Sequence, residues 1–436
     1  MKNSKRRGLN LKLIYIVIDG MGDLPIKERG NKTPLGAANT PNMDNLARAG
    51  KTGLMYTVSK GIAPESDVSV ISILGYDPFT YETGRGILEA IGSGVEVKNG
   101  DLALRCNFAT LGERKQIIDR RVGRDLTTEE ASKLSQSINE QVTLESYPAD
   151  FDFKSTIGHR AVLVIRSKAK PLSGKITNTD PAYSKIGGIG VAERNVKMVL
   201  RECKPMDKSD EARVSAALVN EFIQKSHAIL DRQEMNRNRV ANGKLKANII
   251  LTRDAGSSVP DFFKINEKYN VRFACLADMP VERGIAELAG ISLIDLPPPS
   301  GDLKSDSLIR MKRLLEILPL YDCVYIHIKS PDEPGHDGDF MLKKRLIEMI
   351  DKHFFGGLLR KINLSDCLIC VTADHSTPCM LRTHSDDPVP LLISGNKIRG
   401  DEVSKFSEAE CLKGSLGILQ KGTQLMPMLM GFLKVR

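Results

Sequence analysis

Two segments in the last quarter of the chain combine aspartate with histidine in patterns that suit metal binding. The first, VTADHSTP, carries Asp374 beside His375, and His384 follows it after a short stretch. The second, HIKSPDEPGHDGD, carries Asp332 and His336. A carboxylate and an imidazole just past a buried strand are costly to bury unless they are paired or bound to a metal ion. This donor set suits zinc, manganese or a similar divalent cation.

The segment between Asp332 and His336 contains Pro334 and Gly335. Both of these residues disfavour a continuous helix. We therefore expect a loop here, in which the aspartate and the histidine converge through a turn and not along one helix face.

Two further candidates lie in the first part of the chain. Asp19 follows the apolar run 13–18, at the carboxyl end of a predicted first strand, where open α/β sheets place ligands. A turn aspartate is the alternative. Ser66 precedes an apolar stretch and is predicted to be the N-cap of a helix. A nucleophile or an anion at a helix start also gains from the dipole and from free backbone N–H groups, so both roles can hold together.

Apolar runs that read as buried strands precede most of these groups. They cover 13–18, 248–252, 271–277, 325–328, 368–371 and 389–394. Near-continuous β-branched runs are typical of strands that a parallel sheet buries on both faces, and helical patterns alternate with the later strands. The sequence therefore predicts an α/β fold with a central, mostly parallel sheet and with its chemistry at the strand ends.

The character of the sequence changes after about Val95. Charged helical patterns over 125–140 and 211–232 alternate with a short apolar strand at 161–165, and a polar stretch at 233–246 reads as a connector. Several short motifs carry side chains that suit carboxylate or phosphate oxygens. The candidates are Arg120, Arg124, His159, Arg160, Asp180 and Arg253. A solvated charged surface is the alternative for each single arginine.

Composition limits the class of protein. The chain has 436 residues, of which 27% are charged and 41% hydrophobic, enough for two domains with a sizeable core. Its net charge of +9 is spread along the sequence, tryptophan is absent, and no nucleic-acid-binding motif occurs. We therefore expect a small anionic substrate and no nucleic acid. No apolar run approaches the roughly 20 residues that cross a bilayer, so we expect a soluble, cytoplasmic protein without membrane contact.

The eight cysteines form no disulfide framework. Cys367 and Cys370 make one C-x-x-C pair at the start of an apolar run, without a second pair to complete a zinc site. We expect buried, reduced thiols.

Seven candidate groups accumulate at the predicted strand ends. They are Asp19, Ser66, Asp332, His336, Asp374, His375 and His384. Seven ligands are more than one metal ion needs, so we expect two metal sites. Two metal ions held close together are the usual means of stabilising both oxygens in an in-line phosphoryl displacement. A serine hydroxyl bound to one ion would lose its proton and become a nucleophile. His227, His327 and His353 lie in helix or strand patterns and are predicted to be structural.

Several long segments occur in an order that is similar to that of a known family. They are IVIDGMGD, TPLGAANTPNMDNLARAG, APESDVSVISILGYDP, HIKSPDEPGHDGD and VTADHSTP, followed by His384. Over essentially its whole length the chain resembles the archaeal-type, cofactor-independent phosphoglycerate mutases of the alkaline phosphatase superfamily. The resemblance implies that Asp332, His336 and His384 hold one metal ion and that Asp19, Ser66, Asp374 and His375 hold the other. Ser66 would be the serine that is transiently phosphorylated.

The resemblance also implies the domain organisation. A phosphatase-like core would comprise 1–95 and 257–436, with helices flanking the sheet, and a smaller inserted α/β (α+β) domain at 96–256 would bind the substrate. The substrate residues would be Arg120, Arg124, His159, Arg160, Asp180, Arg253 and Arg283. Arg283 stands where a lysine is expected, and it keeps the charge but not the point-donor geometry.

The implied reaction is the interconversion of 3-phosphoglycerate and 2-phosphoglycerate. It would need two divalent cations, with manganese preferred over magnesium, zinc or cobalt, and no bisphosphoglycerate. A metal-dependent phosphomonoesterase, or a mutase for another small phosphorylated metabolite, is the alternative within the same class, since one core serves many reactions. A metal-binding protein without catalysis is the alternative from another class, and in it Ser66 would be dispensable.

Overall fold

The chain forms two compact units in a computed structural model that describes residues 11–81, 84–186, 189–193, 196–396, 398–401 and 403–434. Unit 1 comprises Met1–Tyr81, Phe262–Asp278 and Ile285–Arg436, and unit 2 comprises Glu82–Asp261 and Met279–Gly284. No helix in the described part of the chain is long and apolar enough to span a membrane.

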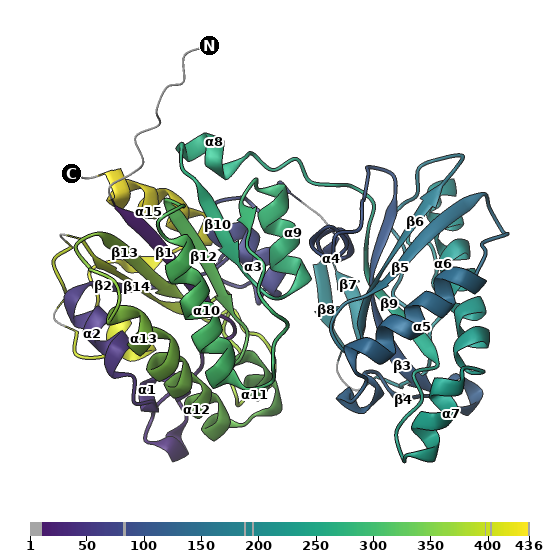
Figure 1. Ribbon diagram of the computed structural model, residues 1–436, viewed down its shortest axis with the longest axis horizontal. Coiled ribbons are helices and arrows are strands. Elements are labelled where there is room, and N and C mark those ends of the chain that lie inside the picture. Colours follow the sequence, from purple (N-terminus) through teal and green to yellow (C-terminus); the bar gives the residue numbers. More distant parts are fainter. Residues whose placement is uncertain are drawn as a thin grey trace, which may run out of the picture. The chain divides into compact units, whose positions relative to one another are not determined.

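Unit 1 is built on an eight-stranded sheet with the order β11-β10-β12-β1-β13-β14-β2-β15 (Figure 1). The pairings from β11 through β13 and between β2 and β15 are parallel, and only those of β14 with β13 and β2 are antiparallel. The strands are β1 (Lys12–Ile18), β2 (Lys51–Met55), β10 (Phe273–Leu276), β11 (Ser292–Leu293), β12 (Cys323–Ile328), β13 (Cys367–Thr372), β14 (Val389–Gly395) and β15 (Gly417–Leu419). The predicted class, a mostly parallel sheet with helices around it, is confirmed.

Helices cover both faces of this sheet, which is why its central strands are apolar without alternation. Every residue of β12 and β13 is buried. One layer contains α2 (Pro41–Ala49), α10 (Leu303–Ile317), α12 (Phe340–Ile350) and α13 (Gly356–Leu359). The other contains α3 (Ser66–Ile73) and α15 (Leu425–Lys434), and the Tyr15 hydroxyl of β1 donates to the Ile73 carbonyl of α3.

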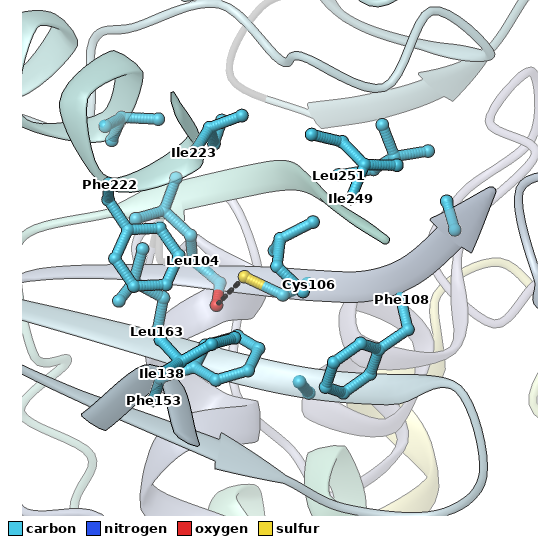
Figure 2. Close-up of a cluster of buried hydrophobic side chains, with 14 of the residues drawn as sticks. Leu104, Cys106, Phe108, Ile138, Phe153, Leu163, Phe222, Ile223, Ile249 and Leu251 are labelled. Carbon is cyan, nitrogen blue, oxygen red and sulfur yellow. Dashed lines mark hydrogen bonds between the residues drawn. The ribbon is translucent and has the colours of Figure 1, made fainter. Parts of the chain in front are cut away.

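Unit 2 is built on an antiparallel sheet in which β3 (Leu102–Leu111) pairs with β4 (Ile117–Asp119), β6 (Arg160–Ser167) and β9 (Ile249–Gly256), and β6 pairs with β5 (Ala149–Ser155). Alternate residues of β3 face opposite sides of the sheet. Leu104, Cys106 and Phe108 pack against residues of α5 (Thr128–Gln141) and α6 (Asp210–Leu230), as Figure 2 shows. Ala103 packs on the opposite side against α4 (Arg85–Gly92). A short hairpin, β7 (Tyr183–Ile186) and β8 (Ile189–Ala192), completes the unit.

Two local predictions are wrong in ways that matter for the site. Residues Asp332–Asp337 form helix α11 and not a loop. Pro334 lies in its first turn, where a backbone N–H would have no helical acceptor in any case. Ser66 is the first residue of α3, and Glu65 is the N-cap.

Two predictions in the second half of unit 2 are also wrong. The supposed connector contains helix α7 (Glu234–Ala241), in which two polar residues, Asn236 and Arg239, are buried and bond to other parts of unit 2. Asn236 Nδ2 donates to the carbonyls of Leu230 and Ala247, and Arg239 is paired with Glu130. The strand predicted at 248–252 as part of the parallel sheet is β9, which lies antiparallel in unit 2.

All eight cysteines are buried and free, as predicted.

Candidate active site

The carboxyl ends of the central parallel strands of unit 1 gather the predicted metal ligands. Asp19 follows β1, Asp374 and His375 follow β13, and Asp332 begins α11 just after β12. Because β1 pairs in register with both β12 and β13, these three strand ends lie side by side. Gly20 must be glycine here, since its φ is +61° and a Cβ would stand 2.7 Å from Asp332 Oδ1.

The first group of ligands is Asp332, His336 and His384. The two Nε2 atoms of His336 and His384 are 3.2 Å apart, and they lie 3.4 and 3.6 Å from the Asp332 carboxylate. Helix α11 creates this geometry, because residues four apart lie on the same helix face. The aspartate and the histidine of this helix therefore meet along a face, where the sequence predicted a turn.

The second group surrounds His375, whose Nε2 lies 3.1 Å from Asp19 Oδ1 and 3.4 Å from Asp374 Oδ2. Ser66 Oγ lies 3.3 Å from the same nitrogen. The serine stands at the N-terminus of α3, where backbone N–H groups without helical acceptors and the helix dipole favour an anion. The structure thus brings all seven predicted residues together.

The hydrogen bonds of the three histidines leave each Nε2 available as a metal ligand. Nδ1 of His384 lies 2.8 Å from the Pro64 carbonyl and Nδ1 of His336 lies 3.3 Å from the Arg382 carbonyl. A carbonyl oxygen only accepts, so in both rings the proton of a neutral imidazole sits on Nδ1.

In the third histidine, His375, the neighbouring Thr377 hydroxyl fixes the same tautomer. The Thr377 hydroxyl donates to Asp332 Oδ1 at 2.7 Å, so it must accept from His375 Nδ1 at 3.0 Å. A proton on Nδ1 leaves a lone pair on Nε2, the atom that faces Asp19, Asp374 and Ser66.

Buried carboxylate oxygens support the fit of this site to cations. Asp19 Oδ1 and Asp374 Oδ2 are buried and accept no hydrogen bond from any described residue. Burial alone raises the pKa of Asp19, but Lys329, His327 and His375 hold that pKa well below its usual value. Burial lowers the pKa of His384, but the carboxylates of Asp332 and Glu65 raise it to about 10. The buried carboxylates therefore need positive charge close by to neutralise them, and divalent cations can provide it.

Two residues near these ligands were missed by the sequence reasoning. Lys329 Nζ lies 2.7 Å from Asp19 Oδ2, and His327 Nε2 lies within 4 Å of both Asp19 and Asp374. Both stand at the end of β12, so their position was a usable signal. His327 was assigned a structural role because it lies inside an apolar strand pattern.

A fully buried lysine connects the two loops that carry the predicted metal ligands. Lys343 Nζ, on α12, donates to the Gly22 carbonyl at 3.0 Å, to Asp23 Oδ2 at 2.8 Å and to the Thr377 carbonyl at 2.8 Å. An ammonium group has three donors, and all three are used. The contacts join the loop after Asp19 to the loop after His375.

A glutamate next to this lysine network makes the stability of the protein depend on pH. Glu408 accepts from Asp23 N and from the Thr33 hydroxyl, yet burial raises its pKa to about 7 from 4.5. The folded state therefore binds the proton more tightly than the unfolded state. The stabilising contribution is fully present below about pH 4.5 and is lost as the pH rises through about 7.

We expect the free energy of unfolding of the wild type, relative to Glu408→Gln, to fall between pH 4.5 and 7. Urea unfolding across this range measures the difference. Glu410→Gln is the control, because Lys413 lowers the pKa of Glu410, so the contribution of Glu410 changes below about pH 4.5 and stays nearly constant between pH 4.5 and 7. A difference that does not change with pH would contradict the assignment to Glu408.

Unit 2 gathers the predicted anion-binding residues. Arg120 forms a bidentate pair with Asp180, with Nε 2.8 Å from Oδ1. The guanidinium groups of Arg120 and Arg253 lie 5.0 and 3.7 Å from the centre of the Tyr183 ring. Arg253 Nε is buried and makes no hydrogen bond to any described residue.

Two arginines that the sequence reasoning missed belong to the same region. Arg105 Nε lies 3.2 Å from Glu89 Oε1, and Arg85 Nε lies 2.8 Å from the same oxygen. Burial raises the pKa of Glu89, but Arg105, Arg85 and Arg253 together hold it below its usual value. A charged residue in the middle of the apolar strand β3 was a signal for Arg105.

The pKa of His159 reflects the positive charge of the arginines around it. Burial lowers its pKa, and Arg160, Arg121, Arg105 and Arg124 lower it further, to about 3. Six of the predicted substrate residues thus lie in a region of unit 2 that repels a further proton. Arg283 lies on α9 (Pro280–Leu288), and its role stays a prediction.

Fold and site together define a class of protein. It is an α/β protein in which a serine at a helix N-terminus lies beside carboxylates and imidazoles arranged for divalent cations.

Comparison with known proteins identifies the family within this class to which the chain belongs. The family described as 2,3-bisphosphoglycerate-independent phosphoglycerate mutase matches residues 47–236. The mutase of that name from Aeropyrum pernix is 43% identical over 96% of this chain and 98% of its own, and that from Thermococcus kodakarensis is 39% identical over 98% and 97%. The chain belongs to this family.

Two solved structures are similar to this chain over nearly its full length. A protein from Pyrococcus horikoshii is 31% identical, with a TM-score of 0.77 over 98% of both chains. The cofactor-independent phosphoglycerate mutase from Thermoplasma acidophilum is 30% identical, with a TM-score of 0.59 over 97% of this chain and 100% of its own.

Proposed function

We propose that this protein interconverts 3-phosphoglycerate and 2-phosphoglycerate without bisphosphoglycerate, and that Ser66 carries the phosphoryl group between the two positions. One observation carries the proposal. Ser66 Oγ stands at the N-terminus of α3, 3.3 Å from His375 Nε2, within a cluster of carboxylates and imidazoles. Membership of the mutase family supplies the reaction.

Two divalent cations, bound by the two ligand groups, would neutralise the phosphoryl oxygens and lower the pKa of the Ser66 hydroxyl. Manganese is the cation to test first, with magnesium, zinc and cobalt as alternatives. The free N–H groups at the start of α3 add positive potential at Ser66.

The transfer proceeds in two steps with opposite bond changes. The bond between phosphorus and the substrate oxygen breaks as a bond from phosphorus to Ser66 Oγ forms, and the substrate oxygen takes up a proton. Glycerate then reorients, and its other hydroxyl takes the phosphoryl group back from the serine. Water must be kept away in between, since hydrolysis of phosphoserine would turn the transferase into a phosphatase.

The arginines of unit 2 suit the carboxylate of the substrate, because their forked donors match its two oxygens. Replacing Arg253 by methionine is expected to raise KM about 30-fold, since a hydrogen bond to a charged group contributes about 2 kcal/mol. We expect kcat to change less, and steady-state kinetics measure both.

The control for this variant is Arg166→Met. Arg166 lies on the same sheet and its Nη1 is 2.7 Å from Asp152, within a partly exposed pair. An unchanged KM in Arg253→Met, with the control also unchanged, would remove Arg253 from the substrate site.

The direct test of the serine is to trap its phosphorylated form. The metal-loaded protein is mixed with 3-phosphoglycerate, quenched in acid and digested with trypsin, which cleaves after Lys60 and Arg85. We expect phosphate on the released peptide, at Ser66. Turnover without phosphate on this peptide, or phosphate at Ser69 or Ser72, would overturn the assignment.

A further inference from the structure

A fourth histidine of unit 1 faces the carboxylates of the second ligand group. His327 lies at the end of β12 and is 1% exposed. Its Nε2 is 3.9 Å from Asp19 Oδ2 and 3.8 Å from Asp374 Oδ2. The strand register explains the position, because His327 pairs with Val17 of β1, which in turn pairs with Thr372 of β13. His327 thus stands beside the ends of both strands that carry these aspartates.

Asp19, His327 and Asp374 each offer one donor atom within 4.8 Å of the others, a spacing that suits one ion. Metal bonds to carboxylate oxygen and imidazole nitrogen are about 2.0–2.2 Å, so donors on a tetrahedral ion lie about 3.4 Å apart. His375 Nε2 lies 3.1 Å from Asp19 Oδ1 and 3.4 Å from Asp374 Oδ2, and both histidines therefore approach the same two carboxylates, His327 Nε2 at 3.9 Å from Asp19 Oδ2 and 3.8 Å from Asp374 Oδ2. The buried oxygens Asp19 Oδ1 and Asp374 Oδ2, which accept no hydrogen bond from described residues, belong to the same group.

The other ring nitrogen of His327 is held as it is in the predicted ligand histidines. Nδ1 lies 2.8 Å from the hydroxyl of Tyr325, which can accept a hydrogen bond from Nδ1 when Nε2 binds a metal ion and which donates to Nδ1 in the other tautomer. His336, His375 and His384 likewise have Nδ1 bonded to an oxygen and Nε2 turned toward carboxylates. Metal-bound histidines characteristically donate their second N–H in this manner, which sets the tautomer and the ring orientation.

We propose that His327 Nε2 is a ligand of the metal ion that Asp19, Asp374 and His375 bind. The inference rests on the proposed two-metal site and adds a residue to it. Each ion then has two imidazole ligands, His336 with His384 and His327 with His375. Imidazole donors favour cations such as zinc and cobalt over magnesium, so this site discriminates against magnesium more strongly than a site with one imidazole would.

The competing role for His327 is that of a hydrogen-bond donor that orients the two carboxylates. Metal affinity alone does not separate these roles, because loss of an orienting group also weakens metal binding about 10- to 100-fold. A measurement that detects the metal–nitrogen bond itself does separate them.

The test is nuclear magnetic resonance of the full-length protein with ¹⁵N-labelled histidines, stripped of metal and loaded with ¹¹³Cd²⁺. A one-bond coupling between cadmium and Nε2 is expected at four histidines, and His327→Gln is expected to remove one coupling and keep three. Tyr325→Phe provides a second assignment, because it perturbs only the ring whose Nδ1 it contacts. His227 is the internal control, since its Nδ1 lies 2.6 Å from the Asn248 carbonyl in unit 2, and it must show no coupling.

The outcomes separate this inference from the proposed site. Couplings at His336, His375 and His384 together with a protonated, uncoupled Nε2 at His327 would overturn the inference and leave the two-metal site intact. The absence of coupling at every histidine would overturn the two-metal site itself.

Discussion

Replacing Ser66 by alanine is expected to reduce the interconversion of the two phosphoglycerates by at least about 10³-fold, the scale on which enzymes lose activity without their nucleophile. The change removes one oxygen from the N-terminus of α3 and leaves the carboxylates and imidazoles around it in place. Both metal ions are therefore expected to stay bound. An enolase-coupled assay measures the loss, and metal content after gel filtration measures the binding.

Ser69→Ala is the matched control for this variant. Ser69 lies one turn further along α3, is buried, and donates to the Glu65 carbonyl at 3.1 Å. Its loss removes one hydrogen bond, worth about 1 kcal/mol of stability, and should leave turnover nearly unchanged. Near-normal mutase activity in Ser66→Ala would contradict the nucleophile assignment, whatever the control shows.

Replacing Lys343 by methionine is expected to cost about 3–5 kcal/mol in the free energy of unfolding of unit 1, because it leaves Asp23 charged, buried and without its cation. Both side chains have no exposed area in the pair. Two backbone carbonyls, of Gly22 and Thr377, lose their donor at the same time. Urea unfolding, combined with hydrogen exchange of the Thr377 amide that donates to the Gly22 carbonyl, measures the effect.

The neighbouring Lys344 supplies the control. Its ammonium group pairs with Glu348 four residues along α12, in a pair that is about a quarter exposed. Lys344→Met should change stability by less than about 1 kcal/mol, as is usual for such pairs. If Lys343→Met is equally mild, the buried lysine does not hold the ligand loops together.

The sheet of unit 1 was predictable from sequence because parallel strands buried on both faces are long apolar runs, and their carboxyl ends share one edge. That rule led from Asp19 and Asp374 to a common site. It also located His375, which directly follows Asp374 past the end of the strand. The same sequence segments thus contain both the candidate metal ligands and the ends of the strands that position them.

Other features depended on tertiary context. Helix α11 was missed because Pro334 counts against a helix by propensity, although the first helical turn tolerates it. His327 was assigned to the core because burial in a strand does not reveal which neighbours its ring faces. The sequence predicts a connector in place of helix α7, since the partner of its buried Arg239 is Glu130, far away in the chain.

The dependence on tertiary contacts also explains why features of unit 2 were not predicted from the sequence. Strand β9 has the apolar pattern of a core strand, and only its pairing with β3 assigns it to the antiparallel sheet. Arg105 lies on that sheet opposite Glu89 of α4, a contact between segments that sequence patterns treat separately.

The proposed mutase reaction is tested most simply by an enolase-coupled assay on 3-phosphoglycerate without bisphosphoglycerate. It is run after stripping with EDTA and again after adding manganese, with free phosphate followed in the same tube. We predict activity that disappears on stripping and returns with the metal, with little phosphate released. Release of phosphate without formation of 2-phosphoglycerate would show that the protein is a phosphatase and not a mutase.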